Sequence, residues 1–537
     1  MFPVLLVLSL GCGAPPVQAP PERRVAAVEL SPADLEVDTR SSGGDGVQLQ
    51  ATVTYDDGVV EDGTTQVEWG SSNETAGLVD ATGWFQPATD NGGVTWITGR
   101  LAGVEGRSTV TVVWQDDRVE EGADPSLFEG TGAATPASLW LYPEDGVSLP
   151  RNTPGVNFQW AAPEGVVPDA WQVRFRSALT DITVTTTASS WTADEATWQA
   201  IASTNAGGTV EVSLAMVSGG QRYEDAPIRV TVDRFDADGA IVYWSSSASG
   251  FLRIPYGQVA EPFLTSDQTG SCMGCHAISR DGDIAFTYDG GNGPMGIKDP
   301  DGVDIVGHDG GLTGNFKAWS PDGSRLVSSS DGVLSLWDTA TWTSLGTVPV
   351  SGMATQVDWS PDGTLLAMVL PQEESLDWIF SGGAVAVMEV LDGDRFGAVT
   401  VLYTPPAGQN AYYPAFSPDG DWLAFNVSTG DSYDDPDAEL WVIPTRGGTA
   451  LPLDRANGDG QRTNSWPRWG PLPDDEILWL AFSSKRPYGA ITAGNPQIWV
   501  AAFDPAVADL GLDPSYPAFW LPNQDTAQSN HIPVWTR

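Results

Sequence analysis

The chain has 537 residues, 41% of them hydrophobic, and 70 Asp and Glu against 25 Lys and Arg give a net charge of −45. This charge argues against nucleic acid and anionic membrane surfaces as direct partners, and it suits basic partners, cations or simply a solvated surface. The length suggests about three domains, and the 23 Trp favour an all-β protein.

Residues 1–24 are predicted to be an export signal and a tether. The apolar run Met1–Leu10 leads into Leu8-Ser9-Leu10-Gly11-Cys12, which resembles a bacterial lipoprotein signal. The resemblance implies that Cys12 becomes the lipidated first residue of the mature chain. No later run of 18 apolar residues predicts a membrane span. We therefore expect an exported protein, in the periplasm or at the cell surface, that touches a membrane only through this lipid anchor.

Residues 25–114 alternate apolar and polar side chains in short runs between Gly and Asp turns, which is typical of half-buried strands. The order of its pieces resembles a bacterial Ig-like group 2 domain: Val28–Pro32, Leu49–Val53, Val67–Trp69 and Thr109–Val112. We expect a β-sandwich that acts as a spacer or adhesive module. Residues 115–137, acidic and rich in Gly and Ala, are predicted to be a linker.

Residues 138–256 return to strand patterns, such as Trp171–Phe175 and Val210–Leu214. This region is distantly similar to fibronectin type III domains, which implies a second β-sandwich. A helical turn is expected at Asp194–Ile201. No function can be inferred from this domain.

The sequence repeats between residues 257 and 537. Trp-Ser-Pro-Asp-Gly occurs at Trp319–Gly323 and Trp359–Gly363, a third copy lies at Phe416–Gly420, and degenerate copies begin at Ser279 and Trp469. In such turns Pro sets φ, Asp bonds the backbone and Gly takes a positive φ, so these residues are structural. Four strands in about 40 to 60 residues are typical of a β-propeller blade. The turns resemble those of TolB-like propellers, which are built of WD40-like blades.

Alignment of the repeats gives six starts of a blade's first strand: His276, Lys317, Val357, Pro414, Pro467 and Pro533. We expect six blades, with five as the alternative, because only Val534 to Arg537 follow the sixth start. That blade must then take its other strands from upstream. Ring closure places the terminal strand beside the first blade.

Ser271-Cys272-Met273-Gly274-Cys275-His276 contains the Cys-x-x-Cys-His spacing of a c-type haem attachment site. Two thiolates at this spacing can each form a thioether with one porphyrin vinyl group, and the adjoining imidazole then lies under the iron. The sequence predicts one covalent haem c, with Cys272 and Cys275 as attachment points and His276 as the proximal ligand.

Three alternatives compete with haem at this motif. A Cys272–Cys275 disulfide leaves His276 unexplained, a zinc site needs further Cys or His ligands, and a thioredoxin-like pair expects a βαβ context. The disulfide is the main rival.

The first strand of each blade lines the central channel of a propeller, so we expect the haem over or in one mouth of that channel. His531, two residues before Pro533, is our candidate for the distal iron ligand. Met353 is the alternative, followed by Met295 and His308, or the position is open.

One haem and an acidic surface favour an exported c-type electron-transfer or redox protein that docks to a redox partner. A binding or scaffold module that grips a protein or glycan, with a structural or sensory haem, is the second hypothesis. A haem peroxidase-like enzyme with an open distal site is the third. The sequence contains no Gly-x-Ser-x-Gly, His-Glu-x-x-His or phosphate-loop motif, so we assign no catalytic residue.

Overall fold

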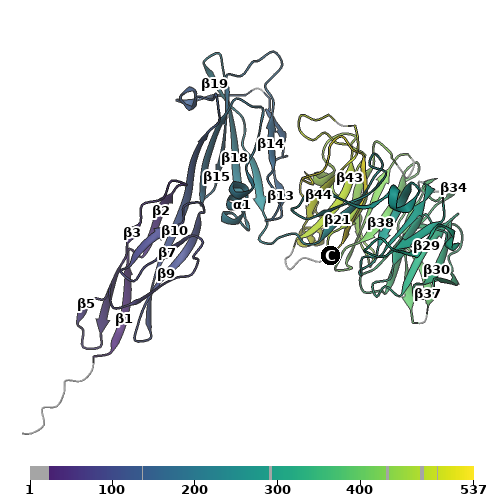
Figure 1. The fold of residues 1–537 in the computed structure, drawn as a ribbon, viewed down its shortest axis with the longest axis horizontal. Helices are drawn as coiled ribbons and strands as arrows, with labels where there is room; N and C mark the ends of the chain where they lie inside the picture. The colour runs from purple at the N-terminus through teal and green to yellow at the C-terminus, as the bar shows by residue number, and fades with distance from the viewer. Residues whose placement is uncertain are drawn as a thin grey trace, which may run out of the picture. The chain divides into compact units, whose positions relative to one another are not determined.

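The computed structural model describes residues 23–135, 137–289, 293–392, 394–430, 434–471, 477–492 and 494–536. The chain is nearly all β, which confirms the predicted class. It separates into two compact units, Met1–Trp114 and Gln115–Arg537 (Figure 1). Cys12 lies outside the described residues.

The first unit is a β-sandwich whose sheets have the orders β1-β4-β5, β3-β8-β7 and β2-β10-β9-β6. Alternating side chains of these strands fill its core, where Leu49, Phe85, Ile97 and Val110 are fully buried. Its strands are β1 (Val25–Ser31), β2 (Asp34–Thr39), β3 (Val47–Gln48), β4 (Gln50–Tyr55), β5 (Val60–Asp62), β6 (Glu68–Ser71), β7 (Gly77–Val79), β8 (Trp84–Pro87), β9 (Gly93–Leu101) and β10 (Val104–Val119), the last of which continues beyond the unit.

The second unit begins with another sandwich. One sheet contains β19-β18-β15-β16, with β20 paired to β18 and β13 paired to β20, and the other has the order β12-β14-β17. The expected helical turn is the helix α1 (Glu195–Thr204), which Asp194 caps by accepting a hydrogen bond from Thr197 N at 3.0 Å. The strands are β12 (Trp140–Tyr142), β13 (Val147–Leu149), β14 (Asn157–Trp160), β15 (Ala170–Arg176), β16 (Thr180–Thr186), β17 (Ser190–Thr192), β18 (Gly208–Ser218), β19 (Gln221–Glu224) and β20 (Ile228–Val232).

The segment expected to be a linker is packed against this second sandwich. Its 3-10 helix η1 (Pro125–Phe128) buries Phe128 against Ala170 and Val217, and β11 (Ala133–Ala134) pairs with β19. The linker prediction for residues 115–137 therefore needs correction. One buried aromatic ring and a short edge pairing fix a segment whose composition is otherwise that of a loop.

Residues 240–536 form the propeller. Among the described residues, six four-stranded antiparallel sheets occur, and a separate hairpin pairs β34 (Glu373–Leu376) with β35 (Ile379–Ser381). From the innermost strand outwards the sheets are β24 (Met273–Ile278), β25 (Ile284–Tyr288), β26 (Met295–Lys298) and β27 (Asp304–Val306); β28 (Phe316–Trp319), β29 (Arg325–Ser330), β30 (Val333–Asp338) and β31 (Thr343–Thr347); β32 (Thr355–Trp359), β33 (Leu365–Leu370), β36 (Ala384–Leu391) and β37 (Arg395–Tyr403); β38 (Asn410–Phe416), β39 (Trp422–Ser428), β40 (Glu439–Pro444) and β41 (Leu451–Pro452); β42 (Ser465–Trp469), β43 (Leu478–Ser484), β44 (Gln497–Phe503) and β45 (Phe519–Trp520); and β46 (Asn530–Thr536), β21 (Ala240–Ser245), β22 (Gly250–Pro255) and β23 (Glu261–Thr265).

Short helices accompany these sheets. They are α2 (Ser266–Thr269), η3 (His308–Gly310), α3 (Asp454–Asn457) and α4 (Pro505–Asp509).

The last of the six sheets closes the ring. β46 pairs with β21, so the teal strand β21 lies among the yellow C-terminal strands in Figure 1. The innermost strands contact one another in the order β24, β28, β32, β38, β42 and β46, and β46 also contacts β24. The terminal strand takes its sheet partners from upstream, as its short length requires. The propeller thus begins at Ala240, inside the region 138–256 that was expected to be the second sandwich.

The Ser-Pro-Asp-Gly turns have the structural role expected of them. Asp322 Oδ1 accepts hydrogen bonds from Ser320 Oγ at 2.6 Å and from Ser324 N at 3.0 Å, and Gly323 has a φ of +71°. Asp362 makes the same bonds in the next sheet, to Ser360 Oγ at 2.7 Å and to Thr364 N at 3.0 Å. The carboxylates of these aspartates therefore accept hydrogen bonds within their own turns.

Candidate functional site in the central channel

A β-bulge recurs in the innermost strands and sets what faces the channel. The pairing register shifts between Gly274 and Ala277 in β24, and equivalent shifts occur in β32, β38, β42 and at the β46 pairing. The bulges confirm the repeat alignment for five of the six strand starts. In each of them the residue before the predicted start has a positive φ: Cys275, Gln356, Tyr413, Trp466 and Ile532. Such a residue leaves the ladder and turns its side chain out of the regular alternation.

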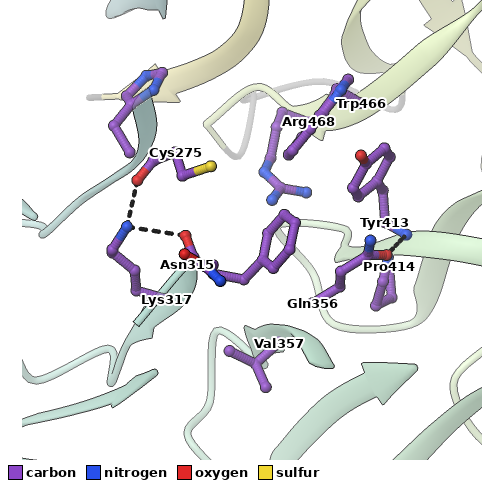
Figure 2. Close-up of a pocket in the computed structure, with 11 residues that line it drawn as sticks. Cys275, Asn315, Lys317, Gln356, Val357, Tyr413, Pro414, Trp466 and Arg468 are labelled. Atoms are coloured by element: carbon purple, nitrogen blue, oxygen red, sulfur yellow. Dashed lines mark hydrogen bonds between the residues drawn. The ribbon is translucent and has the colours of Figure 1, made fainter. Parts of the chain in front are cut away.

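Most of these bulge residues line one cavity on the propeller axis (Figure 2). About 10 Å³ of it is open to the centre of a water-sized sphere, which is room for about one water molecule. The Tyr413 and Trp466 rings stack at 3.7 Å on its wall. The lining residues are Cys275, His276, Asn315, Phe316, Lys317, Gln356, Val357, Tyr413, Pro414, Trp466 and Arg468.

The two cysteines of the predicted haem motif are free thiols. Cys272 is exposed just before β24, and the neighbouring Ser271 Oγ donates a hydrogen bond to Asp289 Oδ1 at 2.6 Å. Cys275, with a φ of +45°, directs its sulfur into the axial cavity (Figure 2). Burial raises the pKa of the Cys275 thiol, although the charge of Lys317 acts in the opposite direction. The disulfide expected as the main rival of haem is not formed.

His276 is buried in the wall of the channel. Its side chain is 7% exposed, and its ring packs on the Phe251 ring with centroids 4.4 Å apart. Neither ring nitrogen has a hydrogen-bond partner; the backbone of Val242 lies near but outside hydrogen-bond geometry. Burial lowers the pKa of His276 to about 3. The imidazole is therefore neutral at physiological pH, as a metal ligand must be.

These residues fit haem c in their chemistry. Two free thiols at the required spacing adjoin a neutral imidazole whose nitrogens are both unsatisfied, and an unsatisfied buried polar group calls for a partner. The volume of the cavity, in contrast, does not fit the haem. A cavity that admits about one water cannot hold a porphyrin, and Phe251 covers the imidazole. Seating the group requires Phe251 and the channel wall to move apart.

None of the four expected distal ligands lines the axial cavity. The His531 ring packs on Trp244 at 5.5 Å, and burial lowers its pKa to about 4. Met353 packs over Gly332, and Met295 is fully buried in the core between the first two sheets. His308 is exposed beside Asp289 and Asp309. Closure of the ring brings β46 beside β24, but it does not bring His531 to this cavity.

A lysine ammonium lies beside the motif. Lys317, 6% exposed, donates hydrogen bonds to the Cys275 carbonyl, to Thr287 Oγ1 at 2.7 Å and to Asn315 O at 2.9 Å. All three acceptors are neutral, so these bonds leave its charge uncompensated. Burial lowers the pKa of Lys317 to about 8.

A second cation enters the cavity from β42. Arg468 points its guanidinium towards the cavity centre (Figure 2), and within the described residues its Nη1 donates a hydrogen bond to Pro467 O at 3.0 Å. Burial lowers the pKa of Arg468. Asp358 is the carboxyl that interacts with it; burial raises the pKa of Asp358, and its Oδ2 accepts a hydrogen bond from Phe416 N at 2.7 Å.

Sequence reasoning missed these polar residues as members of a site. Lys317 was recognised only as a strand start, and Arg468 and Asp358 follow their own strand starts directly. The signal was present in the repeat alignment, because the same position holds Ala in three other copies: Ala277, Ala318 and Ala415. A charged residue at a position where related strands have Ala indicates a role other than packing.

The opposite mouth of the channel holds a larger cavity of about 290 Å³. Its rim is formed by the prolines of the repeated turns and their counterparts: Arg280, Pro321, Pro361, Pro418, Pro471 and Thr536. The repeat that fixes the turns thus also builds this mouth.

Among the described residues, no group of three or more His, Cys, Asp or Glu is arranged to hold a metal ion. No helix in the described part of the chain is long and apolar enough to cross a membrane.

Comparisons with known proteins agree with a propeller. The model of the WD domain, G-beta repeat, matches residues 304–338, which run from β27 of one sheet to β30 of the next. No curated protein matches the sequence.

Among solved structures the chain is similar to two TolB proteins and to a hydrazine synthase. TolB from Acinetobacter baumannii is 14% identical, with 61% of this chain and 79% of that chain covered and a TM-score of 0.38. A putative TolB from Agrobacterium tumefaciens is 16% identical, covering 53% and 89% at a TM-score of 0.34. Kuenenia stuttgartiensis hydrazine synthase is 14% identical, covering 56% and 75% at a TM-score of 0.34. These likenesses concern the fold and say nothing of activity.

Proposed function

We propose that the protein is an exported, monohaem c-type cytochrome-like propeller protein that transfers electrons. The observation that carries the proposal is the neutral, buried imidazole of His276, unpartnered at both nitrogens and adjoined by the free thiols of Cys272 and Cys275. A buried imidazole left without a partner is costly unless a ligand completes it.

In this proposal Cys272 and Cys275 hold the haem through thioethers, and His276 binds the iron. When bound, the haem supplies a one-electron ferric–ferrous couple. Among the chain's own residues, Lys317 fixes the Cys275 carbonyl, and Phe251, which packs on the imidazole in this structure, has to move aside for the haem. The exposed position of Cys272 gives the group an edge near the surface, where a partner can exchange electrons.

The partner and location follow from charge and from the N-terminus. A net charge of −45 suits docking to a basic redox protein. Lipidation of Cys12 would anchor the chain after export. The two sandwiches, with their resemblance to bacterial Ig-like group 2 and fibronectin type III domains, then act as spacers.

The test is covalent haem in protein made with the c-type maturation machinery. We expect haem staining on denaturing gels for the wild type, weakened or lost staining for Cys272→Ser and Cys275→Ser, and full staining for the neighbouring control Ser271→Ala. A wild-type chain without covalent haem overturns the proposal. A low-spin spectrum with a reversible one-electron potential supports electron transfer, whereas a high-spin spectrum supports a peroxidase-like or sensory role.

A second function is a binding or scaffold module with a structural haem. It is favoured by the closed cavity of about 10 Å³ and by the Phe251 ring over His276, because a site so tightly packed stabilises a fold better than it admits a reactant. Covalent haem that exchanges no electrons with small redox mediators is the result that distinguishes this function from the first.

A further inference from the structure

The Arg468 guanidinium is a cation with unused donors inside the axial cavity. An arginine side chain has five N–H donors, and among the described residues Arg468 donates one hydrogen bond, to Pro467 O. No carboxylate oxygen of the described residues lies within 4.0 Å of its nitrogens, since no ion pair is formed. Arg468 is half-buried, so its remaining donors can bind water or a small anion that enters the cavity.

A second unsatisfied donor faces the same cavity. Gln356 is 3% exposed, and its Oε1 accepts a hydrogen bond from Tyr413 N at 2.8 Å. Its Nε2 has no partner. Figure 2 shows Gln356 and Arg468 on the wall of one cavity. Two donors without acceptors therefore converge on a space that no protein acceptor fills.

We propose that this cavity binds one halide-sized anion, held by the Arg468 guanidinium and the Gln356 Nε2. The size follows from the cavity, whose open space of about 10 Å³ admits about one water-sized particle. The charge follows from the donors, because Arg468 and the nearby Lys317 present positive charge and no carboxylate lines the cavity. Cys275 and His276 line the same cavity, so the anion site belongs to the haem-free chain.

Two carboxyl groups that interact electrostatically with residues of the cavity wall, those of Asp358 and Asp377, accept hydrogen bonds elsewhere. Asp358 accepts a hydrogen bond from Phe416 N, and Asp377 accepts bonds from Asn315 Nδ2 at 3.0 Å and Gly332 N at 2.7 Å. Burial raises the pKa of both carboxyls, and Asp358 interacts electrostatically with Arg468 without forming an ion pair. The bound anion neutralises positive charge of Arg468 and Lys317 that these two carboxyl groups do not pair with.

The test uses the full-length chain in halide-free buffer, with bromide as the probe and gluconate, too large for the cavity, to keep ionic strength constant. We expect an anomalous bromine peak beside Arg468 in crystals and an unfolding temperature that rises with bromide concentration. Arg468→Gln should weaken bromide binding roughly tenfold or more, the effect of losing a hydrogen bond to a charged group. The control Arg280→Gln, at the opposite mouth, should leave binding unchanged.

Gln356→Met provides an independent arm if Arg468→Gln does not fold, because it removes the second donor and keeps a similar volume. It should also weaken bromide binding. An absent bromine peak, equal stabilisation by bromide and gluconate, or unchanged bromide binding in both cavity variants overturns the proposal. Water alone then fills the cavity.

Discussion

Substitution of His276 tests how deeply the haem motif is buried. Burial lowers the pKa of His276 to about 3, whereas a histidine in an unfolded chain titrates near 6.5. Between these pH values the unfolded chain binds a proton that the folded chain does not. The free energy of unfolding therefore rises with pH from about 3 to 6.5, and stability is lost as the pH falls through this window.

The size of the effect follows from the shift. One pKa unit corresponds to about 1.4 kcal/mol, so protonation of the unfolded chain costs the folded state about 3 kcal/mol at pH 4.5 and almost nothing at pH 7.5. His276→Leu removes this group and keeps an apolar side chain against Phe251. We expect the stability difference between wild type and His276→Leu to change by about 3 kcal/mol between these pH values, in favour of the variant at acid pH.

The assay is urea unfolding of the full-length, haem-free chain across this range, with the propeller transition compared between variants. Other titrating groups cancel in the difference. The control is His308→Gln, because the carboxylates of Asp309 and Asp289 raise the pKa of this exposed histidine. Its contribution has the opposite sign: it stabilises the fold at low pH and is lost as the pH rises through the raised pKa.

Parallel stability curves for wild type and His276→Leu would refute the burial of a neutral imidazole. The same linkage applies to haem-loaded protein, because iron bound to His276 in the folded chain would also exclude a proton there. We then expect the haem-loaded wild type to keep the acid dependence that His276 contributes.

Three further substitutions test the fold and the anchor. Phe251→Ala should destabilise the propeller by about 3–5 kcal/mol in urea unfolding, since Phe251 is fully buried on His276, whereas Phe235→Ala, at a ring that is 40% exposed, should have little effect. Asn426→Leu keeps the volume but leaves three backbone groups without partners and should cost about 3 kcal/mol or more, unlike Leu at the exposed Asn495; equal stabilities would contradict the role given to this amide. Cys12→Ser should release the mature chain from membranes in fractionation, and a wild type that is already in the soluble fraction removes the anchor.

The repeats made the propeller predictable from sequence. Turns such as Trp319–Gly323 contain the Pro, Asp and Gly that this turn geometry requires, and the spacing between the turns predicts how many strands lie between them. The register of the innermost strands could be predicted for the same reason, down to the equivalence of His276 and Pro414. The sheet that closes the ring was harder to locate, because β21 and β22 carry no such turn and resemble strands of any sandwich.

The direction of side chains could not be predicted. The Cys-x-x-Cys-His spacing constrains covalent chemistry, but a bulge decides which way each residue points. At Cys275 the bulge turns a thiol into the channel, while the ring of His276 packs against Phe251 of another strand. A contact between residues so distant along the chain leaves no local pattern. For the same reason the side chain of His531 does not line the cavity, although its strand β46 lies beside β24, as ring closure requires.

The bulges explain why the channel wall is polar at all. Each bulge takes backbone groups out of the strand ladder, and buried backbone groups need other partners. Side chains of adjacent strands supply them by accepting from the N–H of the residue at positive φ. The pairs are Tyr413 with Gln356 Oε1, Trp466 with Asn426 Oδ1 and Ile532 with Ser483 Oγ.

This role separates structural polar residues from candidates for ligand binding. Lys317 donates hydrogen bonds to the Cys275 carbonyl and to two other oxygens, so it supports the bulge at the haem motif. Gln356 supports the bulge at Tyr413 through its carbonyl oxygen, but its Nε2 is unpaired. No bulge in the described strands uses Arg468, whose bond to Pro467 O stays within its own strand. Gln356 and Arg468 thus differ from Lys317 in keeping donors that the bulges do not use, and both line the cavity beside Cys275.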